Sequence, residues 1–348
     1  MTPYIMAIML FTVGLGTSIT FASSHWLIAW MGLEINTLAI IPLMAQDHSP
    51  RGVEASAKYF IIQSGASAAL IFASATNAWI TGYWDIQQMA HPFPLALITT
   101  ALAFKMGLAP LHTWLPEIIQ GLDLTTGLIL STWQKLAPFI LMLQIYPPAT
   151  PTLIVLGLAS ILLGGWGGLN QTQLRKLLAY SSITHLGWMI IVLQFSPPLA
   201  LLSLLTYFLM TFSAFLVFKF NKATTINSLA ISWAKAPIIT TLLPPVLMSL
   251  GGLPPLTGFM SKWLILQELT SQGLAVTATL ASLSSLLSLY FYLRIAHAMT
   301  LTTPPNDIPG MTPWRHGASP LSQPMAMAMI MSIIMLPLVP AILAFFTR

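Results

Sequence analysis

The chain has 348 residues, of which 56% are hydrophobic and only 6% are Asp, Glu, Lys or Arg. Soluble domains carry about 25% charged residues, so this chain has too few charges to cover a surface in water. A soluble globule is therefore excluded, and most of the surface must face lipid. The excess of 13 basic over 8 acidic residues does not indicate nucleic acid, which we do not expect as a partner. The absence of cysteine excludes disulfides, zinc fingers and cysteine-ligated iron-sulfur clusters in this chain.

The apolar stretches of the chain predict helices that cross a bilayer of about 30 Å. Cutting at polar and Pro-rich breaks gives eleven of them, at about 3–22, 25–45, 57–81, 92–111, 124–146, 151–169, 174–195, 198–219, 237–267, 274–297 and 323–346. The longest connection, 298–322, is rich in proline and should be extended coil, and we expect the other connections to be short hairpins. The sequence thus predicts an all-α polytopic membrane protein with a single membrane domain.

Two of the predicted helices contain a Gly/Pro interruption beside a lysine. They read FKMGLAPLH at 104–112 and LGGLPPLTGFMSK at 250–262, in the fourth and ninth stretches. An offset of five helices predicts two inverted five-helix repeats, at about 1–146 and 151–297, followed by a last helix. The prolines at the interruptions, which must kink or unwind each helix, are Pro110, Pro254 and Pro255. Paired broken helices in the two halves of a transporter are typical of its transport site, whereas a packing kink is the alternative.

Four ionisable residues fall inside the apolar stretches, namely Glu34, Lys105, Lys135 and Lys262. A charge near the bilayer centre costs at least about 2.5 to 3.5 kcal/mol, so such residues usually pair or lie on an ion pathway. Lysine suits a proton relay because burial and neighbouring charges can switch its protonation state, whereas arginine is effectively always charged. We therefore predict a proton path through these residues. The alternative is a set of buried ion pairs that only hold helices together.

Two histidines are candidates for a supporting role in such a path. His112 follows the first interruption, and His185 lies in the middle of the seventh stretch. Histidine can titrate near neutral pH and relay protons with hydroxyl groups or water. A buried histidine with an ordinary packing role remains the alternative for both.

The loop charges predict the orientation of the chain. Alternate loops place nine basic residues on the side of the N-terminus: Arg51, Lys58, Arg175, Lys176, Lys219, Lys222, Lys235, Arg294 and Arg315. The opposite side receives only Arg348. Because positive charge is retained on the side of synthesis, we expect the N-terminus there and the C-terminus across the membrane.

Three motifs carry a resemblance to a known family: FKMGLAPLHTWLPE at 104–117, TWQKLAP at 132–138 and GGLPPLTG at 251–258. Together they resemble the antiporter-like membrane subunits of respiratory complex I, the mitochondrial NADH:ubiquinone oxidoreductase. Within that group they are most similar to the subunit 2 family in its vertebrate form. The resemblance spans essentially the whole chain.

The resemblance implies a proton-translocating subunit of the membrane arm, driven by NADH oxidation and ubiquinone reduction. By similarity, Glu34 and Lys105 would form a charge pair, Lys135 the central relay and Lys262 the lysine on the exit side. The chain itself would bind no cofactor or metal, because NADH, flavin, iron-sulfur clusters and ubiquinone would be used by other subunits.

The resemblance also implies partners and a location. The partners would be membrane lipid and other membrane-arm subunits, including a neighbouring antiporter-like subunit. The location would be the mitochondrial inner membrane, with the N-terminus in the matrix and the C-terminus in the intermembrane space. Two alternatives remain open from the residues alone, namely a stand-alone cation/proton antiporter and a structural spacer that moves no protons.

Overall fold

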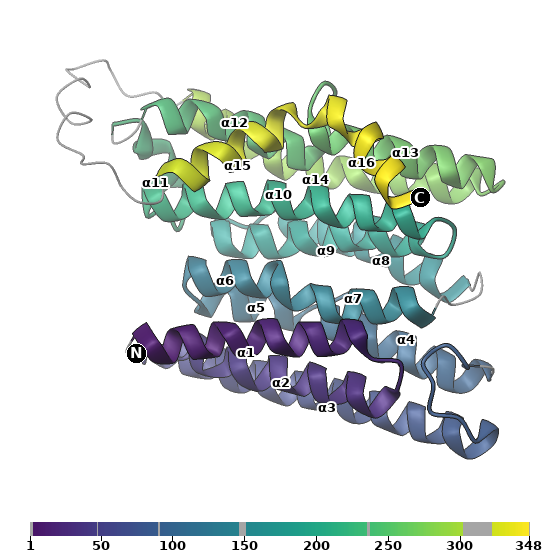
Figure 1. Cartoon of the computed structure of the whole chain (residues 1–348). Coiled ribbons are helices and arrows are strands. Elements are labelled where there is room, and N and C mark those ends of the chain that lie inside the picture. Colours follow the sequence, from purple (N-terminus) through teal and green to yellow (C-terminus); the bar gives the residue numbers. More distant parts are fainter. Residues whose placement is uncertain are drawn as a thin grey trace. The chain divides into compact units, whose positions relative to one another are not determined.

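The computed structural model describes residues 3–46, 48–89, 91–145, 151–234, 237–301 and 322–347 (Figure 1). Within these ranges every regular element is a helix, which confirms the predicted all-α class. The chain forms two compact units, Met1–Leu153 (unit 1) and Ile154–Arg348 (unit 2).

Unit 1 is built from seven helices that lie within its described part. They are α1 (Pro3–Ala22), α2 (Trp26–Met44), α3 (Pro50–Thr81), α4 (Pro92–Met106), α5 (Trp114–Gly121), α6 (Leu124–Ser131) and α7 (Trp133–Ile145). Helix α1 packs mainly on α2, and α3 packs on α2, α4 and α5 (Figure 1). Helix α7 contacts α1, α2 and α4, so that α2, α3, α4 and α7 share one interior.

Unit 2 contains the remaining helices. They are α8 (Pro151–Gly168, which begins just before the boundary), α9 (Leu174–Leu193), α10 (Pro197–Asn221), α11 (Ile226–Ala230), the 3-10 helix η1 (Ile231–Ala234), α12 (Pro237–Gly251), α13 (Thr257–Ser271), α14 (Ala275–Leu301), α15 (Ser322–Ile334), the 3-10 helix η4 (Leu336–Leu338) and α16 (Val339–Thr347). Helix α10 contacts α9, α12, α13, α15 and α16 and so forms the centre of this unit.

The helices have the length and composition of membrane spans. Among the described residues, eight helices are long and apolar enough to cross a membrane, or nine if the bent pair α15 and α16 is one span. Two shorter apolar helices, Pro92–Met106 and Ile238–Gly251, belong to the interrupted stretches. The chain is therefore a multi-pass membrane protein.

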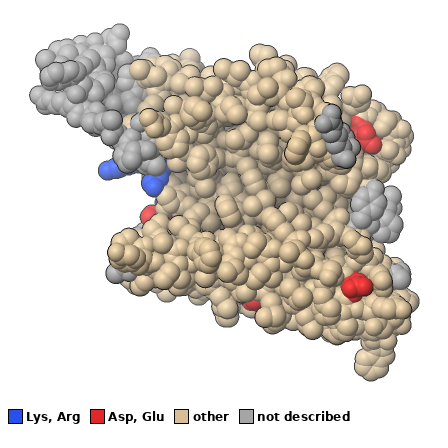
Figure 2. Space-filling model, in the orientation of Figure 1, with Lys and Arg blue, Asp and Glu red and all other residues tan. Residues whose placement is uncertain are grey.

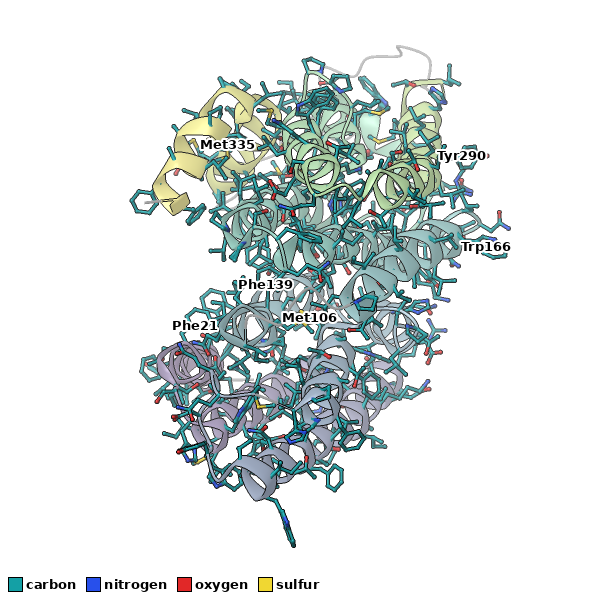
Figure 3. All side chains as sticks on the ribbon, turned by 90° about the vertical axis from the view of Figure 1, so that its right-hand side faces the viewer. Phe21, Met106, Phe139, Trp166, Tyr290 and Met335 are labelled. Carbon is teal, nitrogen blue, oxygen red and sulfur yellow. The ribbon has the colours of Figure 1, made fainter. Side chains whose placement is uncertain are left out.

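The exposed surface is largely apolar, as a lipid-facing surface requires. In the face drawn in Figure 2, few Lys, Arg, Asp or Glu residues are visible among the described residues. Side chains divide between interior and surface in Figure 3, where Met106 lies inside unit 1 and Trp166 and Tyr290 project outward from unit 2. Met106 is 1% exposed, whereas Trp166 is 66% exposed.

Three details of the predicted helix pattern were wrong. The third helix begins at Pro50 rather than at about residue 57, so Arg51 lies in α3 rather than in a loop. The cause is a local start signal, because Ser49 caps the Gly52 N–H at 3.1 Å and Pro50 occupies the first turn. The second error is the connection after the fourth stretch, which contains α5 rather than a simple hairpin.

The predicted stretch 124–146 is confirmed as one candidate span, Leu124–Ile145, in which the single residue Thr132 separates α6 from α7. The third error concerns the last stretch. The last stretch bends by 67° between α15 and α16, with Pro337 in the short η4 segment at the bend. The predicted loop charges Lys235 and Arg315, the C-terminal Arg348 and most of the Pro-rich connection 298–322 lie outside the described residues.

Candidate functional site

The first broken helix ends where its lysine lies. Helix α4 stops at Met106, and Gly107 adopts the left-handed conformation at φ 80° that a residue with a side chain rarely takes. The Leu108 N–H then donates to the Ala103 carbonyl at 3.0 Å, which closes the helix end. Pro110 lies in the turn that follows, before α5 begins at Trp114. The predicted interruption is therefore a true helix end with a turn rather than a bend.

A small internal cavity lies beside this helix end in unit 1. It measures about 20 Å³, enough for about one water molecule. Four helices supply its polar lining: Asn36 and Thr37 from α2, Tyr59 and Gln63 from α3, Lys105 from α4, and Gln134 and Lys135 from α7. Two of the four predicted charges thus face one polar cavity inside an otherwise apolar unit.

Lys105 is buried at 6% exposure, and its Nζ has no hydrogen-bond partner within the described structure. Its main chain is held in place, because Gln63 Nε2 donates to the Lys105 carbonyl at 3.3 Å. A buried ammonium without a direct partner is costly in a membrane interior. The fold therefore keeps Lys105 beside the cavity, where water can solvate it.

Glu34 lies on α2 between Leu33 and Asn36, which both line the cavity. The Thr37 hydroxyl donates to its Oε2 at 3.1 Å, whereas Oε1 is buried with no partner among the described residues. Both side chains are within the described ranges, and no salt bridge joins Glu34 to Lys105. Thr37 connects Glu34 to the cavity, since its hydroxyl bonds the Glu34 carboxylate and its side chain lines the cavity together with Lys105.

Lys135, on α7, lines the same cavity. It is 2% exposed and lies three residues after the interruption at Thr132. This third interruption was not predicted. All three lysines of the predicted path therefore lie close in sequence to a helix interruption.

The second broken helix, in unit 2, has the same local form. Helix α12 ends at Gly251, Gly252 is left-handed at φ 81°, and α13 begins at Thr257 after Pro254 and Pro255. Lys262 reaches back from α13, and its Nζ donates to the Gly251 carbonyl at 2.7 Å. This lysine thus satisfies one of the carbonyls that the end of α12 leaves free.

The two lysines occupy different places in their broken helices. Lys105 lies two residues before the left-handed glycine, whereas Lys262 lies ten residues after the second one. The residue ten positions after Gly107 is Glu117, which pairs with Lys58 at 3.2 Å on the exposed part of unit 1. The two lysines therefore have similar sequence surroundings but different positions, one before its helix break and the other after it.

The two histidines lie apart from the cavity lining. His112 is in the turn between α4 and α5, with its Nδ1 3.2 Å from the Pro110 carbonyl oxygen. His185 is 9% exposed on α9, and its ring lies 5.4 Å from that of Tyr207. Neither histidine lines the cavity that holds Lys105 and Lys135.

Several polar residues of the cavity were missed by sequence reasoning. Tyr59, Gln63 and Gln134 surround the lysines but carry no formal charge, so a search for intramembrane charges passed over them. The sequence does contain a signal for the glutamines, because a glutamine in the middle of an apolar helix needs a hydrogen-bond partner, just as a charged residue needs a counter-charge or water. Within the described ranges, no group of three or more His, Cys, Asp or Glu residues could hold a metal ion.

Buried lysines around a polar cavity, joined to broken apolar helices, define a class of ion-translocating membrane protein. The comparisons with known proteins agree with this class. The family model of the NADH:quinone oxidoreductase/Mrp antiporter transmembrane region matches residues 23–288, and that of the NADH dehydrogenase subunit 2 C-terminus matches residues 289–343. The chain belongs to the NADH-ubiquinone oxidoreductase chain 2 family.

Individual relatives are similar over the full length. The NADH-ubiquinone oxidoreductase chain 2 of Tetraodon nigroviridis is 67% identical over 346 residues, which are 99% of each chain. That of Gadus morhua is 62% identical and also aligns over 99% of each chain. A chain of respiratory complex I from Thermus thermophilus has a TM-score of 0.88 at 28% identity, covering 99% of this chain and 80% of that one.

Proposed function

We propose that the chain is a core membrane-arm subunit of respiratory complex I in the mitochondrial inner membrane. In this role it translocates protons, driven by NADH oxidation and ubiquinone reduction elsewhere in the assembly. Full-length identity of 67% to a chain 2 relative supports the assignment. The observation that supports proton translocation is that Lys105 and Lys135 line one polar cavity. NADH, flavin, iron-sulfur clusters and ubiquinone belong to other subunits in this proposal.

The proposed path in unit 1 runs from Glu34 through Lys105 to Lys135. Water in the cavity and the Thr37 hydroxyl fit the gap between the carboxylate and the lysines, since no salt bridge joins Glu34 to Lys105. A lysine in such a site can take up or release its proton as the charge beside it changes. Lys262 serves as the exit-side lysine in unit 2, and His112 and His185 have supporting roles.

We also propose that the chain has eleven spans arranged as two inverted repeats of five and a last helix. Local features that recur support this arrangement. A Cβ at Gly16 or Gly32 would lie 2.9 Å from the other residue's carbonyl oxygen, where α1 crosses α2. Gly157 and Gly187 have the same reciprocal contact between α8 and α9, at 2.9 and 2.7 Å.

Main-chain pairing recurs at the start of the second helix of each repeat. The Trp26 N–H donates to the carbonyl oxygen of Trp84, and the Leu174 N–H donates to the carbonyl oxygen of Thr224, both at 3.1 Å. Each bond ties the first residue of the second helix to the connection after the third helix. An odd number of helices inverts the second repeat, and an odd total places the termini on opposite sides. The N-terminus is then in the matrix and the C-terminus in the intermembrane space.

The partners in this proposal are the other membrane-arm subunits, including a neighbouring antiporter-like subunit, and lipid. Migration of the chain from membranes solubilised in mild detergent tests the assignment. We expect the chain to migrate within a very large assembly that oxidises NADH. A chain that migrates alone and still exchanges cations for protons across vesicles would instead be a stand-alone antiporter.

A further inference from the structure

A second cavity lies beside Lys262, wholly within unit 2. It measures about 200 Å³ and is formed by the break between α12 and α13, by α14 and by Trp188 of α9. Most of its lining is apolar, including Phe259, Leu266 and Leu289. Among the described residues that line it, Lys262 is the one that carries a charge. The cavity therefore has an apolar body with a single cationic group.

The positive group of this cavity has no acidic counterpart among the described residues. No carboxylate of the described chain lies within 4 Å of Lys262 Nζ. An ammonium has three N–H donors, and one of them goes to the Gly251 carbonyl at 2.7 Å. The hydroxyls of Ser282 and Ser285 also line the cavity, but both donate to carbonyls of their own helix. Donors on Lys262 are thus available to an anion.

The mouth of the cavity is apolar and exposed. Trp263 on α13 is 54% exposed and Leu286 on α14 is 56% exposed. Exposed apolar residues on membrane-spanning helices contact the hydrocarbon of the bilayer. A molecule that enters this cavity therefore arrives from the lipid phase rather than from water.

We propose that this cavity binds the carboxyl head of an unesterified long-chain fatty acid against Lys262, with the chain leaving between Trp263 and Leu286. About 200 Å³ is below the range of pockets that enclose drug-sized ligands, so it suits a small head and a few methylenes of one chain. A glycerophospholipid, with a bulky head and two chains, fits this space poorly.

Binding involves the transfer of one proton from the fatty acid to Lys262, with no change in total charge. A fatty acid crosses hydrocarbon as the neutral acid. When Lys262 has released its own proton along the proposed path, the O–H proton of the acid passes to the Nζ lone pair, which restores the ammonium and leaves an ammonium–carboxylate pair. Such a pair is stabilised in a medium of low dielectric constant, where either ion alone would be costly.

The pair would regulate the proposed proton path. A carboxylate held against Lys262 keeps this lysine protonated, so the proton is not released to the exit side. The regulatory effect rests on the proposed function, whereas binding rests on the cavity alone. Fatty acid should therefore lower the number of protons translocated per NADH through this site.

A photoreactive palmitic acid with a diazirine in its chain tests binding in membranes that contain the intact assembly. We expect cross-links in peptides of α13 and α14, with at least tenfold less labelling by the matching alcohol. Leu286→Trp fills the mouth and should reduce the labelling at least tenfold. Leu283→Trp is the matched control, since Leu283 is 62% exposed on the same helix but does not line the cavity. Equal labelling by acid and alcohol, or no labelling here in the intact assembly, would overturn the proposal.

Proton yield per NADH tests the regulatory effect in the same membranes. Fatty acids also carry protons through bilayers, so each variant is compared with its own yield without palmitate, and the two variants share this background. We expect palmitate to lower the yield about twofold more in Leu283→Trp than in Leu286→Trp. An equal loss in both variants would overturn the regulation. Failure of the proposed function would appear separately, as the absence of proton translocation before any palmitate is added.

Discussion

The Lys262 ammonium donates a 2.7 Å hydrogen bond to the carbonyl oxygen of Gly251, which ends the helix before its own. The lysine thereby joins the two halves of a broken helix through one side chain. Gly252 makes room for it, because a Cβ at this position would lie 2.8 Å from Lys262 Cδ and 3.0 Å from Nζ. The position of this lysine therefore depends on a glycine that carries no charge.

Gly252→Ala should impair proton translocation by displacing Lys262. The substitution also places a side chain at φ 81°, which destabilises the turn by about 1 kcal/mol. Gly273→Ala separates the two effects, since Gly273 has φ 74° and a methyl group there would meet no atom within 4 Å. We expect proton yield per NADH to fall several-fold in Gly252→Ala and to stay near the wild-type value in Gly273→Ala. Similar yields in both variants would show that the position of Lys262 is unimportant.

Glu34 and Lys105 should behave as one functional unit. If the Glu34 carboxylate controls the protonation of Lys105 through the cavity, Glu34→Gln and Lys105→Met remove the same step. Each change should reduce pumping strongly, and the double variant should be little worse than either single variant. Glu34→Asp keeps the charge with a shorter reach and should retain partial function. Losses that add up in the double variant would point to independent sites.

Sequence reasoning located most spans because polar or Gly/Pro breaks bound long apolar runs. Helix α1 has the predicted bounds, and α2 differs from its prediction by one residue at each end. The short helix α5 was missed because eight residues that contain Pro116 do not produce a readable helical period. The break at Thr132 was missed because no Gly or Pro lies at that position.

Only the ionisable residues of the candidate site could be predicted from the sequence. Glu34, Lys105 and Lys135 stand out as ionisable residues in apolar sequence, and two of them line one cavity. The approach of Gln63 and Gln134 to that cavity depends on how four helices pack, which composition and spacing do not reveal. The hydrogen bond from Lys262 to Gly251 also depends on the turn geometry at Gly252.

The orientation of the chain can be tested with a tag at each terminus. In the proposed arrangement the odd number of spans places the two ends on opposite faces, and the predicted excess of basic loops places the N-terminus in the matrix. In sealed mitochondria stripped of their outer membrane, protease should remove a C-terminal tag and leave an N-terminal tag intact. Inverted inner-membrane vesicles provide the control, because the accessibility of the tags should reverse. Removal of both tags from one side would mean that the span count is even.

The most direct test of the central claim is the number of protons translocated per NADH oxidised by the assembly that carries Lys105→Met. The substitution removes the charge beside the cavity but keeps the main-chain carbonyl that accepts from Gln63, so assembly should persist. Lys58→Met is the matched control, because the Lys58 side chain is 45% exposed and solvent screens its surface ion pairs with Glu54 and Glu117. We predict a clear loss of proton yield in Lys105→Met and none in Lys58→Met. A fully assembled Lys105→Met variant with a normal proton yield would contradict the account.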